Sequence, residues 1–375
     1  VRSRWQSTMS IPETLTVAQM APRLRPMPTD EMRRRFEIDA SVSIADAIKH
    51  IAKERITFAC VVSADEGNRV IGAMSERDAL KYAVRASSSA FFSGRDASME
   101  PVTKAMSSAE RMLSVTPQTP VWQALAMIQH KIWRHVPVLD HDERLQSILD
   151  IRDLLLELDG GRTDVERPGT HLRSVWHGQR VADVLRTKRR DAVVEGTTLE
   201  LYLRTRAARH TIHSNESLGR ACQQMAKERL TFLVVLEDAP QSADNPNATL
   251  APPSPFERNR VAGLVNERDF VRFAAERDGL VNDAMDAVRV REIMTPLHSV
   301  QRVGLTENVS ACVDLLFSRN MRHLPVIEGG HLFGVLSLRD ILRPLLPEKS
   351  PGSVLGGAEH NISSSAFRGG TSAGG

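Results

Sequence analysis

The hydrophobic positions of the chain follow a pattern that occurs four times. Four helix starts, at Ile44, Val121, Leu218 and Val309, are each followed sixteen residues later by a strand-like position, at Cys60, Pro137, Val234 and Pro325. Apolar residues after each start recur at spacings of three and four, which is typical of one face of a helix. The strand-like runs at residues 57–62 and 231–236 are continuously apolar, as in strands that are covered on both faces. Four equal spacings indicate an internal repeat.

Each repeat ends in a similar phrase, which predicts a further strand and then a second helix. The phrases run from Gly72 to Asp78, Ser147 to Asp153, Gly263 to Asp269 and Gly334 to Asp340, and each closes on Arg-Asp. The strand-like position precedes the phrase by 12, 10, 29 and 9 residues in the four repeats. The longest of these spacers is polar and rich in proline, which predicts a hairpin loop enlarged over residues 239–259. Each repeat is therefore predicted to run strand, helix, strand, strand, helix.

The repeats form two pairs. We expect the first pair over residues 17–158, as repeats of about 17–85 and 102–158, and the second over residues 179–347, as about 179–277 and 290–347. Residues 159–178 have the composition of a linker, and residues 348–375 that of a flexible glycine and serine tail. Four short apolar leads, at residues 17–20, 102–106, 181–185 and 290–294, are each assigned to the repeat that follows.

Composition and charge exclude several classes of protein. With 41% hydrophobic and 25% charged residues, the 375-residue chain can bury a globular core. A net charge of +3 gives no general attraction for nucleic acid, and no apolar run approaches the roughly 18 residues of a membrane span. The three cysteines stand far apart, which argues against disulfides and a zinc site and for a reducing compartment.

The N-terminal segment, residues 1–16, has the composition of a transit-peptide remnant. Residues 1–35 hold seven arginines, no lysine and three acidic residues, and serines cluster early, as in mitochondrial targeting segments. The other interpretation is a solvated tail. The expected location is therefore mitochondrial, with a cytoplasmic location as the alternative.

The repeats resemble the CBS (cystathionine-β-synthase) domain family, whose members occur as tandem pairs called Bateman modules. The fourth repeat is the most similar, with Arg322-His323-Leu324-Pro325 and the phrase from Gly334 to Asp340. The second repeat is close, with Arg134-His135-Val136-Pro137, whereas the first and third lack this motif. The resemblance implies an α/β fold of two modules, each with two CBS repeats of βαββα order, their sheets packed together and their helices outside. The resemblance leaves two alternatives: the four repeats close into a disc within one chain, or the chain forms a dimer.

The resemblance also implies a regulatory adenine nucleotide, such as ATP, ADP or AMP, or a related adenosyl ligand between the two sheets of a module. In the family pattern a hydroxyl residue and an acid three residues later contact the ribose and phosphates. The matching candidates here are Ser75, Asp78, Asn266, Asp269, Ser337, Asp340 and Asp153. A carboxylate can accept hydrogen bonds from a ribose diol, and the N-terminus of the following helix attracts phosphate.

Each of these candidates also has a purely structural interpretation. Ser, Asp and Asn are preferred helix N-caps, and an acid three residues later completes a capping box. In the second repeat Asp150 replaces the hydroxyl, which adds a carboxylate that disfavours a phosphate there. The candidates for neutralising phosphate are Arg134, His135, Arg322, His323 and Arg339. Alternatively, the arginines, Arg77 and Arg268 included, pair with the adjacent aspartates, and the histidines pack at a strand edge or module interface.

No sequence feature indicates catalysis, because the chain has no P-loop, no metal-ligand spacing and no nucleophile motif in context. The favoured hypothesis is a non-catalytic regulator whose nucleotide occupancy is read by a protein partner, with self-association of the CBS modules. The alternative is a structural or accessory subunit of a larger assembly with degenerate ligand sites. We expect no nucleic acid partner, no metal and no redox cofactor.

Overall fold

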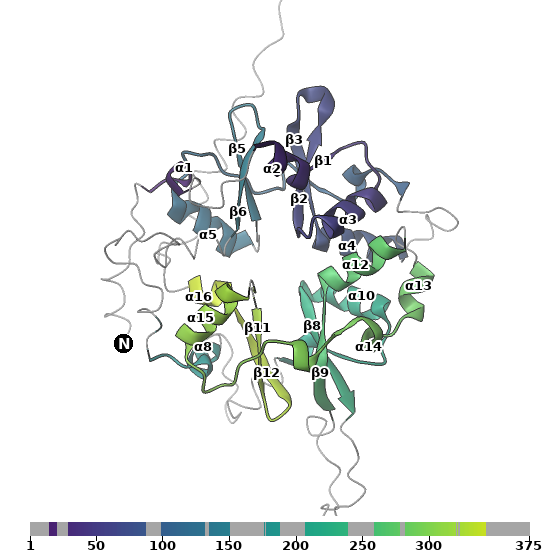
Figure 1. Ribbon diagram of the computed structural model, residues 1–375, viewed down its shortest axis with the longest axis vertical. Coiled ribbons are helices and arrows are strands. Elements are labelled where there is room, and N and C mark those ends of the chain that lie inside the picture. Colours follow the sequence, from purple (N-terminus) through teal and green to yellow (C-terminus); the bar gives the residue numbers. More distant parts are fainter. Residues whose placement is uncertain are drawn as a thin grey trace, which may run out of the picture.

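The computed structural model describes residues 15–20, 29–87, 99–131, 135–150, 176, 178–187, 207–238, 259–277, 282–319, 321 and 323–342. Figure 1 shows four α/β lobes arranged as a ring, one for each predicted repeat. We call repeats one and two the first module, and repeats three and four the second module. One chain therefore brings four repeats together as a disc. The predicted tail and most of the predicted linker lie outside the described residues.

The first repeat has the predicted order of elements. They are β1 (Glu37–Asp39), α3 (Ile44–Lys53), β2 (Phe58–Ser63), β3 (Arg69–Ser75) and α4 (Glu76–Ser87), preceded by α2 (Thr29–Phe36) and with the short turn η3 (Ala64–Glu66) between β2 and β3. β2 lies in the middle, parallel to β1 and antiparallel to β3. The helix α3 begins after Ser43, whose side chain accepts a hydrogen bond from the backbone N–H of Asp46.

The third repeat has the same order and the same strand pairing. Its elements are η7 (Ala208–His210), β7 (Thr211–His213), α10 (Leu218–Glu228), β8 (Phe232–Asp238), β9 (Asn259–Asn266) and α12 (Glu267–Glu276). Asp238 lies opposite Asn259 in the antiparallel ladder of β8 and β9. The predicted insertion therefore connects two strands of one hairpin, while residues 239–258 themselves lie outside the described part of the chain.

The second and fourth repeats have smaller sheets. Their elements are α5 (Val121–Lys131), β5 (His135–Leu139) and β6 (Leu145–Asp150), and α15 (Val309–Ser318), β11 (His323–Glu328), β12 (His331–Ser337) and α16 (Leu338–Leu342). In both repeats a single parallel bridge takes the place of the first strand, between Val115 and Val138 and between Val303 and Val326. The residues predicted to form the second helix of the second repeat lie outside the described part of the chain.

Each lead segment docks on the other repeat of its module, although in the sequence it stands at the start of the repeat that follows it. The leads are α1 (Val17–Met20), η6 (Val102–Lys104) with β4 (Ser107–Ser108), α8 (Val181–Thr187), and α13 (Asn282–Ala287) with α14 (Val290–Ile293), β10 (Thr295–Pro296) and η8 (Leu297–Ser299). In the first module, Thr16 bridges Pro120 of repeat two, while Pro101 bridges Ser43 of repeat one. The second module repeats this exchange.

The glycines of the repeated phrase explain this exchange. A Cβ on Gly72 would lie 2.6 Å from the backbone oxygen of Ser107 in β4, and one on Gly263 would lie 2.3 Å from the backbone oxygen of Thr295 in β10. These leads therefore pair with β3 and β9, and only glycine allows the approach. Sequence order alone does not show this contact, because it does not show which edge strand accepts a lead.

Two kinds of buried contact hold the disc together. Within each module the two sheets share an apolar core. In the first module Phe58 and Cys60 of repeat one pack with Leu139 of repeat two, and in the second module Phe232 of repeat three packs with Ile327 of repeat four. Between the modules, helices pack on helices, repeat one against repeat three and repeat two against repeat four. The helices of the repeats lie on the outer face of each module, as predicted, and that face is buried by the other module. The preceding helix α2 instead contributes Met32 to the core between the two sheets of the first module.

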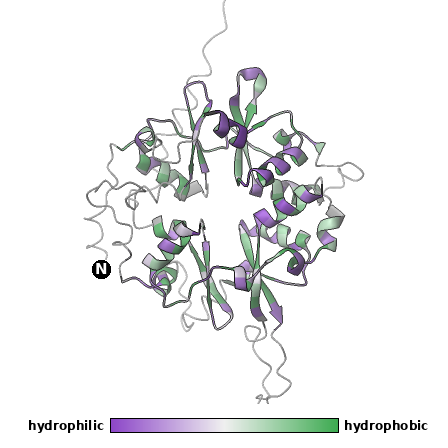
Figure 2. Cartoon of the chain, in the orientation of Figure 1, coloured by the Kyte–Doolittle hydropathy of each residue, from purple (hydrophilic) through white to green (hydrophobic). Residues whose placement is uncertain are grey.

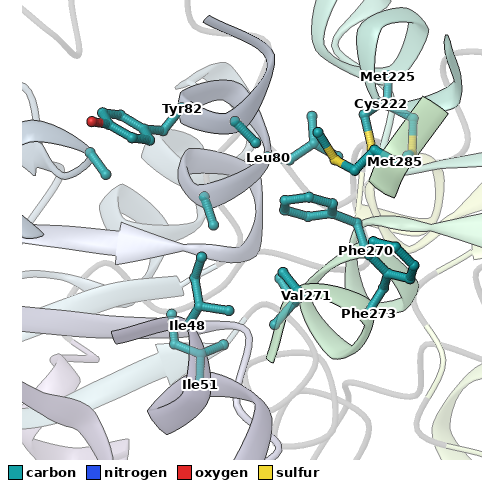
Figure 3. Close-up of a cluster of buried hydrophobic side chains, with 14 of the residues drawn as sticks. Ile48, Ile51, Leu80, Tyr82, Cys222, Met225, Phe270, Val271, Phe273 and Met285 are labelled. Carbon is teal, nitrogen blue, oxygen red and sulfur yellow. The ribbon is translucent and has the colours of Figure 1, made fainter. Parts of the chain in front are cut away.

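The hydropathy of the chain follows this layout. Figure 2 shows mainly hydrophobic positions along the paired strands, whereas α2 is largely hydrophilic. Figure 3 shows the helix contact between repeats one and three, in which Ile48 and Leu80 of repeat one face Phe270 and Val271 of repeat three. Among the described residues, no helix is long and apolar enough to cross a membrane.

Candidate functional site

The junction between β3 and α4 brings Ser75 and Asp78 together. The Ser75 hydroxyl donates to Asp78 Oδ2 at 2.6 Å, and the Ser75 backbone N–H donates to the same oxygen at 3.0 Å. The other carboxylate oxygen accepts a hydrogen bond from the Ser107 hydroxyl at 3.3 Å. Burial raises the pKa of Asp78, and the hydrogen bonds from Ser75 oppose that shift. Both side chains remain partly exposed.

In repeat three the equivalent residues form a complete capping box. The Asn266 side chain accepts from the backbone N–H groups of Arg268, at 2.9 Å, and Asp269, at 3.1 Å. The Asn266 N–H donates to Asp269 Oδ2 at 3.0 Å, and Arg272 donates to Oδ1 at 3.2 Å. Asp269 is only 4% exposed, and burial raises its pKa to about 6. This carboxylate is therefore less accessible to a ligand than Asp78.

Repeat four has the same arrangement as repeat one. The Ser337 backbone N–H donates to Asp340 Oδ2 at 2.7 Å, and its hydroxyl donates to that oxygen at 2.8 Å. Both residues are partly exposed at the start of α16. Hydrogen bonds between the acid and its N-cap residue are thus present at the three described junctions. A role of Ser75, Asp78, Asn266, Asp269, Ser337 and Asp340 in nucleotide binding stays a prediction, and Asp153 lies outside the described residues.

In repeat two the extra carboxylate, Asp150, contacts a histidine. His135 Nε2 lies 3.1 Å from Asp150 Oδ2 and 3.1 Å from the Thr57 hydroxyl of repeat one. Since a carboxylate only accepts hydrogen bonds, the proton lies on Nε2. The imidazole also stacks on Phe58, with ring centroids 5.3 Å apart. From the sequence Asp150 is expected to be an additional negative charge, whereas in the structure His135 Nε2 contacts its carboxylate.

The phosphate-neutralising candidates are only partly covered by the structure. His323 lies 5.5 Å from the Phe232 ring of repeat three, which mirrors the contact of His135 with repeat one. Both histidines thus pack between the repeats of one module. Arg134 and Arg322 lie outside the described residues, as does the side chain of Arg339.

Two other arginines of the repeated phrase bind glutamates of the opposite module. Arg77 Nε donates to Glu267 Oε1 at 2.8 Å, and Arg268 Nε donates to Glu76 Oε1 at 3.0 Å. The repeated phrase suggested the adjacent aspartates as partners of these arginines, and the glutamates were not expected. The available signal was that glutamate precedes Arg-Asp in repeats one and three, but not in repeats two and four.

The described residues supply little chemistry besides hydrogen bonding and charge. Among them, no group of three or more His, Cys, Asp or Glu side chains could hold a metal ion. The three cysteines are free and buried. Burial raises the pKa of the Cys60 and Cys222 thiols strongly and that of Cys312 to about 12, so these thiols are protonated and poor nucleophiles at neutral pH.

Comparison with known proteins agrees with this architecture. The CBS domain family model matches residues 30–85, 102–160 and 290–346. A solved structure of MJ1225 from Methanocaldococcus jannaschii, described as a proposed archaeal homologue of g-AMPK, superposes with a TM-score of 0.58 at 16% identity. It covers 82% of this chain and 94% of its own. That likeness concerns the fold.

Two curated proteins are similar over shorter stretches. An uncharacterised 17.7 kDa protein of Acidianus ambivalens is 26% identical over 140 residues, which is 36% of this chain and 67% of the relative. The mitochondrial CBS domain-containing protein CBSX3 of Arabidopsis thaliana is 27% identical over 94 residues, which is 25% of this chain and 44% of CBSX3. The match thus spans less than half of the plant protein.

Three segments of this chain, residues 30–85, 102–160 and 290–346, thus match the CBS domain family. Residues 208–276, which the family model does not match, have the same order of elements as the first matched segment.

Proposed function

We propose that this protein is a non-catalytic regulator that binds an adenine nucleotide through Ser75 and Asp78 in repeat one and through Ser337 and Asp340 in repeat four. The observation that carries the proposal is that each hydroxyl lies within 2.8 Å of its carboxylate, in a partly exposed position where a strand passes into a helix. The carboxylate is suited to a ribose diol, and the adjacent hydroxyl to a phosphate oxygen.

The other two repeats are weaker ligand sites in this proposal. Asp269 is buried and receives hydrogen bonds from Asn266 and Arg272, so a ribose would have to displace protein donors. In repeat two, Asp150 stands where the others have Ser or Asn, and a second carboxylate disfavours a polyphosphate even beside His135. We therefore expect occupancy to differ between the repeats.

A partner protein would read the occupancy of these sites. By linkage, the nucleotide can shift the affinity for a partner only as far as it binds two states of the disc with different affinity. We also propose a mitochondrial location. The arginine-rich N-terminal composition and the similarity to a mitochondrial CBS-domain protein support it.

A specific observation favours a second candidate function, that of a structural subunit with degenerate sites. The carboxylates of Asp78, Asp269 and Asp340 already accept hydrogen bonds from their own N-cap residues. In that case the repeated phrase would serve helix capping, and the disc would act as a platform in a larger assembly.

Calorimetric titration of the full chain with ATP, ADP, AMP, NADH and S-adenosylmethionine separates the two functions. Asp78→Ala and Asp340→Ala are compared with Asp46→Ala, because the Ser43 hydroxyl donates to Asp46 at 2.7 Å in a cap outside the repeated phrase. The regulator predicts that one of the first two variants loses binding while Asp46→Ala retains it. The structural subunit predicts no binding by the wild type at millimolar ligand, and a similar small loss of stability in all three variants.

A further inference from the structure

The turn at residues 75–78, where β3 passes into α4, carries both a candidate ligand site and a contact between the modules. Its first and last residues form the partly exposed hydroxyl and carboxylate pair of repeat one. Its second residue, Glu76, accepts a hydrogen bond from Arg268 of the second module at 3.0 Å. Its third residue, Arg77, donates to Glu267 of the second module at 2.8 Å. The same four residues therefore meet the candidate ligand and the second module.

Burial makes the contact of this turn with the second module a firm one. The side-chain exposures of the two glutamates are 6% for Glu76 and 2% for Glu267, and Arg77 is 19% exposed. Arg77 also donates to the backbone oxygen of Arg229 in the second module at 3.3 Å. Because a buried carboxylate without its cation is strongly unfavourable, these ion pairs persist as long as repeats one and three stay in contact.

Hydrogen bonds within repeat one restrain the turn less firmly. The first N–H groups of a helix have no acceptor within the helix and depend on other partners. Here the Glu76 N–H donates to the backbone oxygen of Thr57 at 3.2 Å, and the Asp78 N–H donates to the Ser75 hydroxyl at 3.3 Å. Both distances are at the long end for such bonds. The second module therefore adds order to the turn that the first module does not supply.

A ligand that binds an ordered turn loses less entropy when a second contact has already ordered that turn. We propose that Glu267 and Arg268 of the second module are positioning residues for the nucleotide site of repeat one, although they lie about 190 residues away in the chain. This inference rests on the proposed function, because it concerns the same site. By linkage, a nucleotide in repeat one strengthens the contact with repeat three by the factor by which that contact strengthens nucleotide binding.

AMP titration of the full chain by calorimetry tests the positioning role. The binding that belongs to repeat one is the part lost in Asp78→Asn. A double variant, Glu267→Gln with Arg268→Gln, removes both charges of the second module. We expect it to bind AMP in repeat one about tenfold more weakly than the wild type, which lies within the usual range of coupling between two sites. The matched control is Glu66→Gln, which removes a charge from an exposed contact with Arg69 and should leave AMP affinity unchanged.

Hydrogen–deuterium exchange adds a readout that a merely structural role would not change. The reporters are the amides of α10 and α12, which lie in the second module against α4 (Figure 3). Saturating AMP should slow their exchange about tenfold in the wild type, because the nucleotide strengthens the contact by the same factor. The slowing should be absent in Asp78→Asn and should persist in Asp46→Asn, which removes a carboxylate from the cap at Ser43.

The outcomes separate the positioning role from the proposed function. Weaker AMP binding in the double variant together with slowed exchange in the wild type supports positioning by the second module. AMP binding by the wild type without slowing in α10 and α12, with slowing that persists in Asp78→Asn, or with equal affinity in the double variant overturns the positioning role alone. No AMP binding by the wild type at millimolar concentration refutes the site in repeat one, and the positioning role with it. If the double variant does not fold, the exchange of the wild type and of Asp78→Asn decides.

Discussion

Replacing Asp269 by asparagine tests the electrostatics of the third junction. Burial raises the pKa of this carboxyl from 3.8 to about 6, against the opposing effects of Asn266, Arg272 and Arg268. The folded state therefore holds the proton more tightly than the unfolded chain. The favourable contribution of protonated Asp269 to the free energy of unfolding is fully present below the pKa of the unfolded state. It is lost as the pH rises to the pKa of the folded state. Wild-type stability should decrease through this window because of Asp269.

The size of the effect follows from the shift. A pKa difference of roughly two units corresponds to about 3 kcal/mol between the two protonation states. An asparagine side chain at this position cannot ionise, while its oxygen can still accept the hydrogen bond from Asn266 that the carboxylate accepts at 3.0 Å. As the pH rises from acid to neutral, the free energy of unfolding of the Asp269→Asn variant should therefore increase by about 2 to 3 kcal/mol relative to that of the wild type.

Urea unfolding at about pH 4.5 and about pH 7.5 measures this difference, because subtracting the variant from the wild type removes the titration of the other groups. Asp46→Asn is the matched control, since Asp46 forms an exposed cap with Ser43. A difference that does not change with pH would refute the reasoning. So would a wild type that gains stability relative to the variant as the pH rises, because the arginines would then hold the pKa below 3.8.

Three further predictions concern packing. Phe270→Ala should cost about 3–5 kcal/mol in denaturant unfolding, because this ring is fully buried between the modules, and a loss below about 1 kcal/mol would contradict that contact. Gly263→Ala should cost about 1–3 kcal/mol, because its Cβ would clash with the Thr295 backbone, whereas Gly304→Ala, with nothing within 4 Å, should cost far less. The three cysteines should react with a thiol reagent only on unfolding, and rapid labelling of the native protein would show that the burial is wrong.

Much of the fold could be predicted from local patterns. The apolar face of α3 and the continuous run of β2 are each encoded within about ten residues, so their spacing could be recognised in all four repeats. The insertion after β8 was recognised for the same reason, because turn residues interrupt two apolar runs that pair in one hairpin. The Arg-Asp phrase identified the candidate junctions in the sequence. The hydrogen bonds between Ser75 and Asp78 and between Ser337 and Asp340 join an N-cap residue to an acid three residues later, which is the spacing of a capping box.

Contacts between distant segments could not be predicted in this way. The lead that contains Ser107 pairs with β3 of the preceding repeat, and the phrase glycine that permits this looked like an ordinary turn residue in the sequence. His135 and Asp150 lie close in the chain, but their shared contact with Thr57 depends on the packing of two repeats.

The amino-acid sequence by itself determined the repeats, their order of elements and the polar groups at each strand-to-helix junction, because those depend on neighbours within a few residues. Only the tertiary structure decided which repeats face each other and which charges meet. Glu76 and Arg268 are each compatible with solvent, phosphate or a local partner until the modules dock. Docking removes water from Glu76, and the cation that pairs with its buried carboxylate is Arg268 of the other module.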